Sequence, residues 1–230
     1  MWVVAFLGMA TAYAESTLAQ LYKVENAEGQ YRGGPAFYIA RGLRAPWAGS
    51  LFSIFLILSF GLVFNAVQAN SIADAMEGAF GLNKLWVGIA VAILSGIIIF
   101  GGIRQIARVA EVIVPVMAGL YLLLAIAVVI MNLSEIPGVL ALIFSHAFGL
   151  QEAAGGVTGG VLAAMLNGVK RGLFSNEAGM GSAPNIAAVA TPQPHHPSSQ
   201  GFVQALGVFI DTIVILSLIH ISEPTRLRRI

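Results

Sequence analysis

The chain reads GVKRGLFSNEAGMGSAP over residues 168–184, a stretch that suits an uninterrupted helix poorly. Its glycines and its proline weaken a helix, and its serine, asparagine and glutamate side chains are costly in lipid. Because the uncharged segment 153–169 leads directly into it, we expect the stretch to lie at membrane depth. Irregular backbone at that depth is tolerated only where it lines a cavity or is buried in protein. The stretch therefore predicts a membrane helix that is broken beside a binding site.

A broken helix offers two kinds of binding group. Its half-helix N-terminus carries free N–H groups that attract carboxylates, and its unwound carbonyls, together with serine and asparagine oxygens, can hold Na⁺. The alternative is a plain cytoplasmic loop after a span that ends at Lys170–Arg171, which the basic pair favours. A second candidate break is GLQEAAGGVTGG at 149–160, which could equally be an external turn. The residues alone leave these alternatives open.

The composition of the whole chain indicates a membrane protein. Of its 230 residues, 57% are apolar and 10% are charged, against roughly 45–50% and 25% in soluble domains. Mean hydropathy is +0.84. A soluble enzyme, a nucleic-acid binder and a disordered chain are therefore excluded. The absence of cysteine excludes disulfides and thiolate metal sites, and the formal net charge of +1 points to no charged partner.

Several runs with little or no charge are long enough to cross a bilayer core of about 30 Å, which needs about 20 helical residues. We expect an all-α polytopic membrane protein with about six transmembrane helices, one of them discontinuous. The expected spans are 1–21, 46–73, 85–103, 112–131, 153–169 and 202–219.

The distribution of Lys and Arg predicts the orientation, because these residues gather in cytoplasmic loops. They number four, one, two and none in the loops at 22–46, 81–84, 104–108 and 132–152. We therefore expect the first and third of these loops in the cytoplasm and the fourth outside. The proline-rich segment 191–200 then falls in the cytoplasm, where we expect a solvated loop.

Polar side chains towards the end of the second span lie on two faces. Each helical residue advances about 100° around the axis, which places Asn65 and Gln68 on one face and Asn70, Asp74 and Glu77 on another. Gln68 lies deeper, so it is a candidate for contacting a small polar solute. The alternative is an interhelical hydrogen bond, worth only about 0.6 kcal/mol on average in membranes. We expect Asp74 and Glu77 to reach a solvated end of the helix.

Two acidic residues interrupt apolar segments. We expect Glu15 to form a structural ion pair with Lys23 or Arg32, with a proton relay as the alternative. Asp211 has apolar neighbours on both sides, so it must be protonated, paired or facing a wet cavity. The sequence does not choose among these three states.

Neither end of the chain fits the pattern of a complete membrane protein. Met1 opens directly into an apolar segment without a basic region or a cleavage site, which favours an internal methionine or a truncation point over a signal peptide. In the tail 216–230, the apolar residues 216–219 give way to 220–230, whose three arginines would lie outside, against the charge rule. We expect this tail to be artefactual.

The chain resembles the sodium:alanine symporter family, also called alanine or glycine:cation symporters. The resemblance is carried most strongly by RGLFSNEAGMGSAPN at 171–185 and by the opening MWVVAFLG. Further matches are GGPAFYI at 33–39, NAVQANSIADA at 65–75, GGIRQIARVAE at 101–111 and VFIDTIVI at 208–215.

The resemblance implies the inverted-repeat fold shared with amino-acid/polyamine and neurotransmitter transporters. Residues 1–215 would form the second to seventh core helices, and residues 216–230 do not match. The substrate would lie between two broken helices and a glutamine, which is Gln68 here. The resemblance also places seven residues of the motif at the substrate. Phe174 and Ala178 would form apolar walls, and Ser175, Asn176 and Glu177 would shape the unwound turn. The backbone about Gly179 and Gly181 would contact the substrate carboxylate.

The implied function is Na⁺-coupled symport of a small neutral amino acid, alanine or glycine, across the cell membrane, in bacteria the inner membrane. No bond is made or broken, so the protein would not be an enzyme, and no cofactor is expected besides Na⁺ as coupling ion. Because the family's sodium site draws on the first and eighth core helices, we expect this stretch alone to be inactive. A passive facilitator and a structural membrane subunit remain alternatives. An intramembrane enzyme with Glu177 as general base is a further one, which no serine–histidine pair or metal cluster supports.

Overall fold

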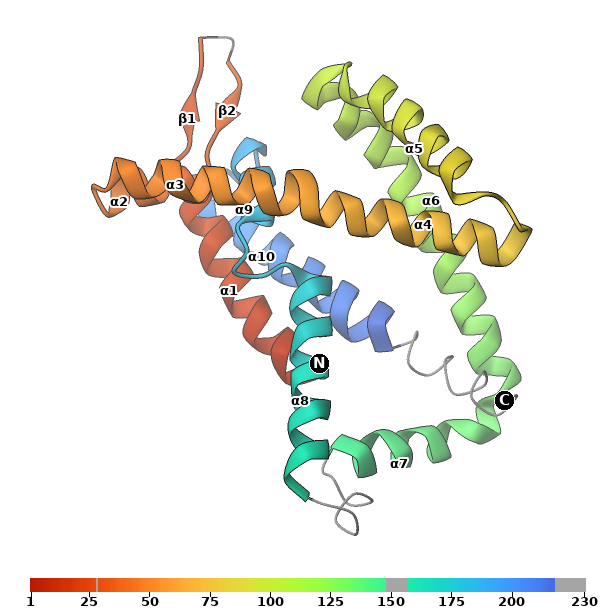
Figure 1. Cartoon of the computed structure of the whole chain (residues 1–230). Helices are drawn as coiled ribbons and strands as arrows, with labels where there is room; N and C mark the ends of the chain where they lie inside the picture. Colours follow the sequence, from red (N-terminus) through yellow and green to blue (C-terminus); the bar gives the residue numbers. More distant parts are fainter. Residues whose placement is uncertain (28, 148–156, 218–230) are drawn as a thin grey trace. The chain divides into compact units, whose positions relative to one another are not determined.

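The computed structural model describes residues 1–27, 29–147 and 157–217. Apart from one two-stranded hairpin, the regular structure of these residues is helical, which confirms the all-α class (Figure 1). The chain forms two units: Met1–Phe52 with the described residues from Leu124 onward, and Ser53–Leu123.

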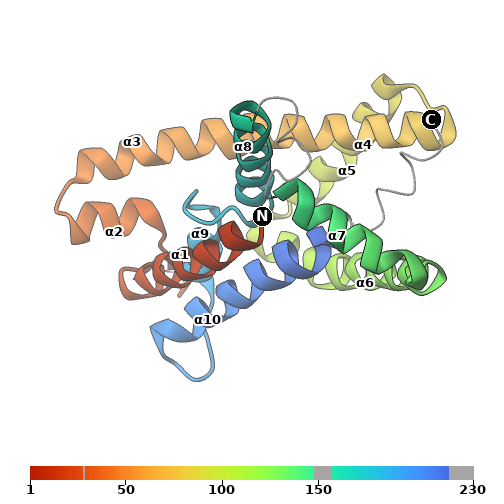
Figure 2. The same cartoon turned by 90° about the horizontal axis from the view of Figure 1, so that it is seen from below.

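The first unit is built around helix α1 (Trp2–Leu21), which packs along α10 (Pro197–Val208), as Figures 1 and 2 show. A Cβ on Gly201 would stand 2.5 Å from Thr17 Oγ1 and 2.9 Å from the carbonyl oxygen of Tyr13. Small residues thus let the two backbones approach closely, as is typical of helix pairs in lipid. The buried residues of α1 are Ala5, Gly8, Ala12, Ser16, Ala19 and Gln20.

Three further segments of the first unit pack against α1 and form the surroundings of the candidate site. These are α8 (Val157–Asn176), α9 (Ser182–Val189) and the π-helical segment η4 (Phe209–Ile215). The segment η4 continues α10 and also contacts α8. The motif that decides the sequence interpretation therefore folds against the N-terminal helix.

The segment 22–46, which we expected to be a loop, contains regular structure. It holds the antiparallel strands β1 (Val24–Glu25) and β2 (Tyr31–Arg32), followed by the helix α2 (Pro35–Gly42). These short elements lie between the first two expected spans, so the segment still connects them. Two-residue strands are too short to produce a periodic sequence pattern.

Side chains at the end of α1 and just after it donate hydrogen bonds to the C-terminal carbonyls of α9. Gln20 Nε2 donates to the carbonyl oxygens of Ala187 and, at 2.9 Å, Ala190, and Lys23 Nζ donates to Ala190 at 3.1 Å. The Lys23 ammonium also lies 4.0 Å from the centre of the Tyr31 ring. Since the last carbonyls of a helix have no intrahelical donor and carry partial negative charge, an amide and a cation are suitable caps.

The longest helix leads from the first unit into the second. It consists of α3 (Pro46–Leu56), the π-helical segment η1 (Ile57–Phe64) and α4 (Asn65–Phe80), 35 residues in all. After a short turn, α5 (Lys84–Ile99) packs back against α4. The expected spans 46–73 and 85–103 are therefore both helical over most of their length.

Helix α6 (Gly102–Met131) begins earlier than the charge distribution predicts. We expected Arg104 and Arg108 in a cytoplasmic turn, but both lie in the first two turns of α6, and the preceding helix ends at Ile99. Pro115 lies inside the helix. A helix of 30 residues is longer than the bilayer core requires, so its charged first turns can lie outside the hydrocarbon.

The segment 132–152, expected to be an external loop, is helical in the part that the structure describes. A short 3₁₀ turn, η2 (Leu133–Glu135), leads into α7 (Ile136–Ala147). Residues 148–156, which include much of the second candidate break at 149–160, lie outside the described residues, as do residues 218–230 of the tail.

Three of the described helices are long and apolar enough to cross a membrane: Pro46–Phe80, Arg104–Met131 and Pro197–Ile215. Lys84–Ile99 is apolar but shorter. These helices confirm a polytopic membrane protein. The total of six spans stays a prediction.

Candidate functional site

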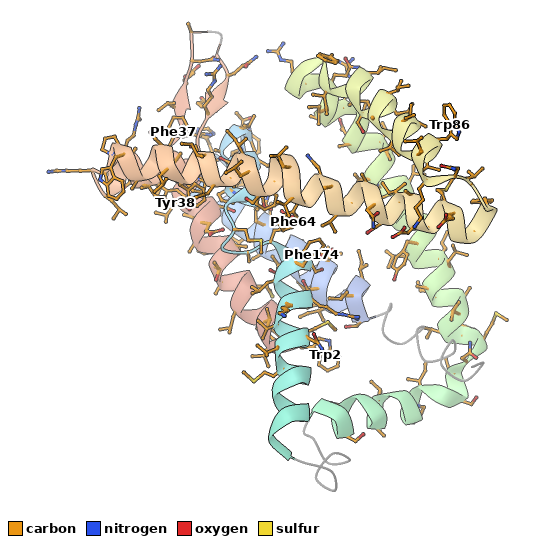
Figure 3. The ribbon with its side chains drawn as sticks, viewed as in Figure 1. Trp2, Phe37, Tyr38, Phe64, Trp86 and Phe174 are labelled. Atoms are coloured by element: carbon orange, nitrogen blue, oxygen red, sulfur yellow. The ribbon has the colours of Figure 1, made fainter. Side chains whose placement is uncertain are left out.

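The helix that enters the motif is interrupted, as the sequence predicts. Helix α8 ends at Asn176 and α9 begins at Ser182, so residues 177–181 form a non-helical segment, here called the break. Phe174 and Ser175, which we expected in the unwound part, still belong to the last turn of α8. Figure 3 shows Phe174 near the end of α8 that leads into the break.

Local chemistry explains why the helix stops here. The Asn176 side chain accepts a hydrogen bond from the Ala178 N–H at 3.0 Å, which offers the backbone an alternative to the next helical bond. The backbone is then left-handed at Glu177 (φ 50°), Gly179 (φ 85°) and Gly181 (φ 86°). Glycine adopts this conformation without strain, whereas glutamate does not.

The unfavourable backbone of Glu177 is held by two hydrogen bonds. Its carbonyl oxygen accepts from the Met180 N–H at 3.0 Å, and its carboxylate accepts from the Ser182 hydroxyl. A left-handed non-glycine residue costs about 1–2 kcal/mol, which two hydrogen bonds of about 1 kcal/mol each can offset. The Glu177 side chain thus supports the break.

The last residue of the break is enclosed by other parts of the first unit. A Cβ on Gly181 would stand 2.5 Å from Phe52 Cζ and 2.9 Å from Pro35 Cγ. Asn185 Nδ2 donates to the Gly181 carbonyl oxygen at 2.7 Å, and the Asn185 side chain packs directly on Gly34. The space at residue 181 is therefore too small for any side chain, and only glycine fits there.

Glu15 contacts the break. Its carboxylate accepts a hydrogen bond from the Gly179 N–H at 3.2 Å. The ion pair expected with Lys23 or Arg32 is wrong, because the ion pairs found among the described residues involve neither of them and Lys23 caps α9 instead. A carboxylate is attracted by unpaired N–H groups of an unwound chain in the same way as by a helix N-terminus.

The charge of Glu15 contributes to the raised pKa of Tyr38 on α2. Burial and the negative charge of Glu15 raise the pKa of Tyr38 to about 12. The phenol therefore keeps its proton at neutral pH, and it adds no second negative charge near the break. Figure 3 shows Tyr38 on α2.

Asp211 is partnered by the motif itself. The Ser175 hydroxyl donates a hydrogen bond to the Asp211 carboxylate, which joins the last turn of α8 to η4. We expected a partner or a proton for Asp211 but did not predict Ser175 as that partner. The available signal was that an acid flanked by apolar residues requires a partner on another helix.

Phe174 and Ala178, the two expected apolar walls, have different surroundings. Phe174 is 46% exposed, whereas Ala178 is 7% exposed and belongs to a buried cluster with Ala12 and Val208. The contacts that both residues are expected to make with a substrate stay predictions.

Gln68 lies in the second unit, on α4, and is exposed there. Its neighbour on the same face, Asn65, donates to the Gly61 carbonyl oxygen at 3.2 Å. The substrate contact expected for Gln68 stays a prediction.

The other polar face of α4 forms the expected separate cluster. Asn70 Nδ2 donates to Asp74 at 2.9 Å, and Lys84 pairs with Asp74 at 2.6 Å and with Glu77 at 3.2 Å. Hydrogen bonds to the two carboxylates raise the pKa of Lys84. The groups are about half exposed, as expected for a solvated helix end.

Comparison with protein families gives a match over most of the chain. Residues 1–221 match the model described as the sodium:alanine symporter family. The amino-acid carrier protein AlsT of Bacillus subtilis is 55% identical over 215 residues, which are 94% of this chain and 45% of that protein. The chain therefore spans a little under half the length of the curated relatives it matches.

Two further relatives differ in the solutes that their names state. A probable sodium/glutamine symporter of Bacillus subtilis, GlnT, is 53% identical over 94% of this chain and 44% of its own length. A sodium/proton-dependent alanine carrier protein of Bacillus sp. (strain PS3) is 41% identical over 94% of this chain and 47% of its own.

Proposed function

Since this chain belongs to the sodium:alanine symporter family, we propose that it supplies part of the pathway by which Na⁺ and a small neutral amino acid cross a bacterial inner membrane together. The observation that supports this proposal best is the interruption of the motif helix at residues 177–181. Backbone N–H groups at such an interruption can bind the carboxylate of a zwitterion.

The hydrogen bond from Gly179 to Glu15 restricts where the substrate binds. Since one carboxylate already accepts from the Gly179 N–H, a second carboxylate there would be repelled. The N–H groups of Ala178 and Met180 also donate within the break, so the proposed carboxylate contact falls to the backbone at Gly181. This differs from the expectation that Gly179 and Gly181 share the contact.

The mechanism that follows is alternating access. Na⁺ and the amino acid bind together, and groups of helices then move to open the site to the other side. Inward movement of Na⁺ contributes about 2.3 kcal/mol per charge for each 100 mV of membrane potential. The residues of this chain bind and orient the solutes, and no covalent step is involved.

The proposed substrate is alanine or glycine. Phe174 and Ala178, the two proposed walls, are apolar, which suits a short side chain without polar groups. The name of one relative states a different solute, glutamine.

A hybrid carrier tests the proposal. It is the Bacillus subtilis carrier with its matching part replaced by residues 1–215 of this chain. We expect radiolabelled alanine uptake by cells expressing the hybrid to fall at least fivefold when external Na⁺ is replaced by K⁺. Uptake that is unaffected by the replacement would support a passive facilitator and contradict symport.

Gln68→Ala in the hybrid carrier tests the proposed contact on α4. Loss of one hydrogen bond to the substrate, about 1.4 kcal/mol, raises the alanine concentration for half-maximal uptake about tenfold. Asn70→Ala is the matched control, because Asn70 lies on the other polar face of the same helix and should leave this concentration unchanged. Equal values for Gln68→Ala and the unmodified hybrid would contradict the contact.

A further inference from the structure

The segment η4 and helix α8 contact each other, and both contact α1. We call the polar residues that η4 and the last turn of α8 bring to this region the junction: Ser175, Asn176, Asp211 and Thr212. Ser175 bonds to Asp211 across it, and η4 contacts both α1 and α8. A Cβ on Gly8 of α1 would stand 2.9 Å from Asn176 Nδ2, so α1 closes the junction on a third side.

The charge of Asp211 is not balanced by a base. Among the residues that the structure describes, the ion pairs are those of Lys84, and the Asp211 carboxylate accepts a hydrogen bond from the Ser175 hydroxyl. The carboxylate lies in the apolar helix Pro197–Ile215 and is partly buried. A hydroxyl can donate one hydrogen bond but supplies no positive charge, so the carboxylate requires a cation or a proton.

The junction also contains polar atoms that lack a partner. Thr212 is 0% exposed and its hydroxyl has none, and Asn176 is 8% exposed with its Nδ2 unpaired. Leaving a buried polar atom unpaired costs about 1–3 kcal/mol. Such groups are rare in folded proteins and require an explanation. The Thr212 oxygen could bind a cation, whereas the Asn176 Nδ2 is a donor and could not.

The backbone around these groups favours a cation. Ser175 and Asn176 form the end of α8, where the helix dipole is negative and the last carbonyls have no intrahelical donor. Asp211 and Thr212 lie in a π-helical segment, a rare conformation that is frequent at functional sites. Carboxylate and hydroxyl oxygens are hard ligands, which suit hard cations.

We propose that the junction is a Na⁺ site in which the Asp211 carboxylate is the charged ligand and the hydroxyl oxygens of Ser175 and Thr212 are neutral ligands. On binding, Na⁺ replaces the Ser175 proton as the partner of the carboxylate, and the hydroxyl turns its oxygen towards the ion. This inference rests on the proposed function, because Na⁺ bound here would be a coupling ion.

Equilibrium binding of ²²Na⁺ to the purified hybrid carrier tests the site without requiring transport. We expect Asp211→Asn, which keeps the shape and removes the charge, to bind one Na⁺ fewer per protein than the unmodified hybrid. Asp74→Asn is the matched control, because that acid is exposed and paired with Lys84, and it should leave the number unchanged. An unchanged number in Asp211→Asn would overturn the proposal.

Thr212 distinguishes an ion ligand from a structural residue. Thr212→Val removes a buried hydroxyl that has no partner, so a merely structural residue would leave stability unchanged or improved. We expect Na⁺ to bind about tenfold more weakly in Thr212→Val while stability in an SDS titration is retained, and Thr212→Ser to restore the affinity. Unchanged Na⁺ affinity in Thr212→Val would contradict the site, and this variant also decides the matter if Asp211→Asn does not fold.

A proton is the other possible occupant of the junction. If Asp211→Asn keeps the Na⁺ stoichiometry but abolishes the pH dependence of alanine uptake, the junction binds a proton and the Na⁺ assignment is wrong. If uptake by the unmodified hybrid does not depend on Na⁺, the proposed function fails. If uptake depends on Na⁺ but Na⁺ binding is the same in Asp211→Asn, the function stands and only this site fails.

Discussion

Gly181→Ala is expected to abolish alanine uptake by the hybrid carrier and to lower its stability by about 2–5 kcal/mol. Two costs add: a left-handed backbone for a residue with a Cβ, about 1–2 kcal/mol, and overpacking of about 1–3 kcal/mol. The overpacking arises because the new Cβ would stand 2.5 Å from Phe52 Cζ and 2.9 Å from Pro35 Cγ. Stability is measured by SDS titration and uptake with radiolabelled alanine.

Two other glycines separate these costs. Gly81 has a left-handed backbone but nothing within 4 Å of a Cβ, so Gly81→Ala should show the strain alone. Gly78 is an exposed helical residue with open space, so Gly78→Ala should be neutral or slightly stabilising. Adding Phe52→Ala to Gly181→Ala should recover part of the lost stability. If Gly181→Ala behaves like Gly78→Ala, the enclosure described for the break is wrong.

Glu15→Ala is expected to reduce alanine uptake by the hybrid carrier about 10- to 100-fold. The change leaves the Gly179 N–H without its carboxylate partner. A hydrogen bond to a charged group contributes about 1.5–3 kcal/mol, and each 1.4 kcal/mol is a factor of ten. Uptake rates at saturating and at limiting alanine show whether translocation or binding is affected.

The conservative variant Glu15→Gln keeps an oxygen that can accept the same hydrogen bond, so its loss of uptake should be smaller than tenfold. Glu25→Ala is the control for removing an acid, because Glu25 lies exposed on β1. If Glu15→Ala takes up alanine as fast as the unmodified hybrid, the hydrogen bond to Gly179 does not maintain the transport-competent conformation of the break.

The break could be predicted from sequence because its causes are local. Glycines, a proline and short polar side chains within 17 residues cannot all be accommodated in one apolar helix, wherever the rest of the chain lies. The point at which α8 ends was less predictable. Phe174 and Ser175 remain helical, and the left-handed Glu177 is stabilised by a hydrogen bond to Ser182 that requires the completed turn.

The partners of the acidic residues could not be predicted. Lys23 lies near Glu15 in sequence, and this favoured an ion pair, but in the fold Lys23 reaches the end of α9 and Glu15 reaches Gly179, 164 residues away. Ser175 and Asp211 are 36 residues apart, and nothing in their own neighbourhoods connects them. A single sequence does not determine which residues far apart in the chain come into contact.

The sequence by itself determined that this chain is an all-α membrane protein and that its motif helix is interrupted. Both properties follow from hydropathy and helix propensity, which act along the chain over one or two turns. Only the tertiary structure decided that Glu15 contacts the break, that Phe52 and Pro35 enclose Gly181, and that Ser175 bonds to Asp211. Such contacts depend on how distant helices pack. Small residues such as Gly8 and Gly201 allow this packing because they leave room for atoms of another segment. Which segment that is cannot be read from the residues near the glycine in the chain.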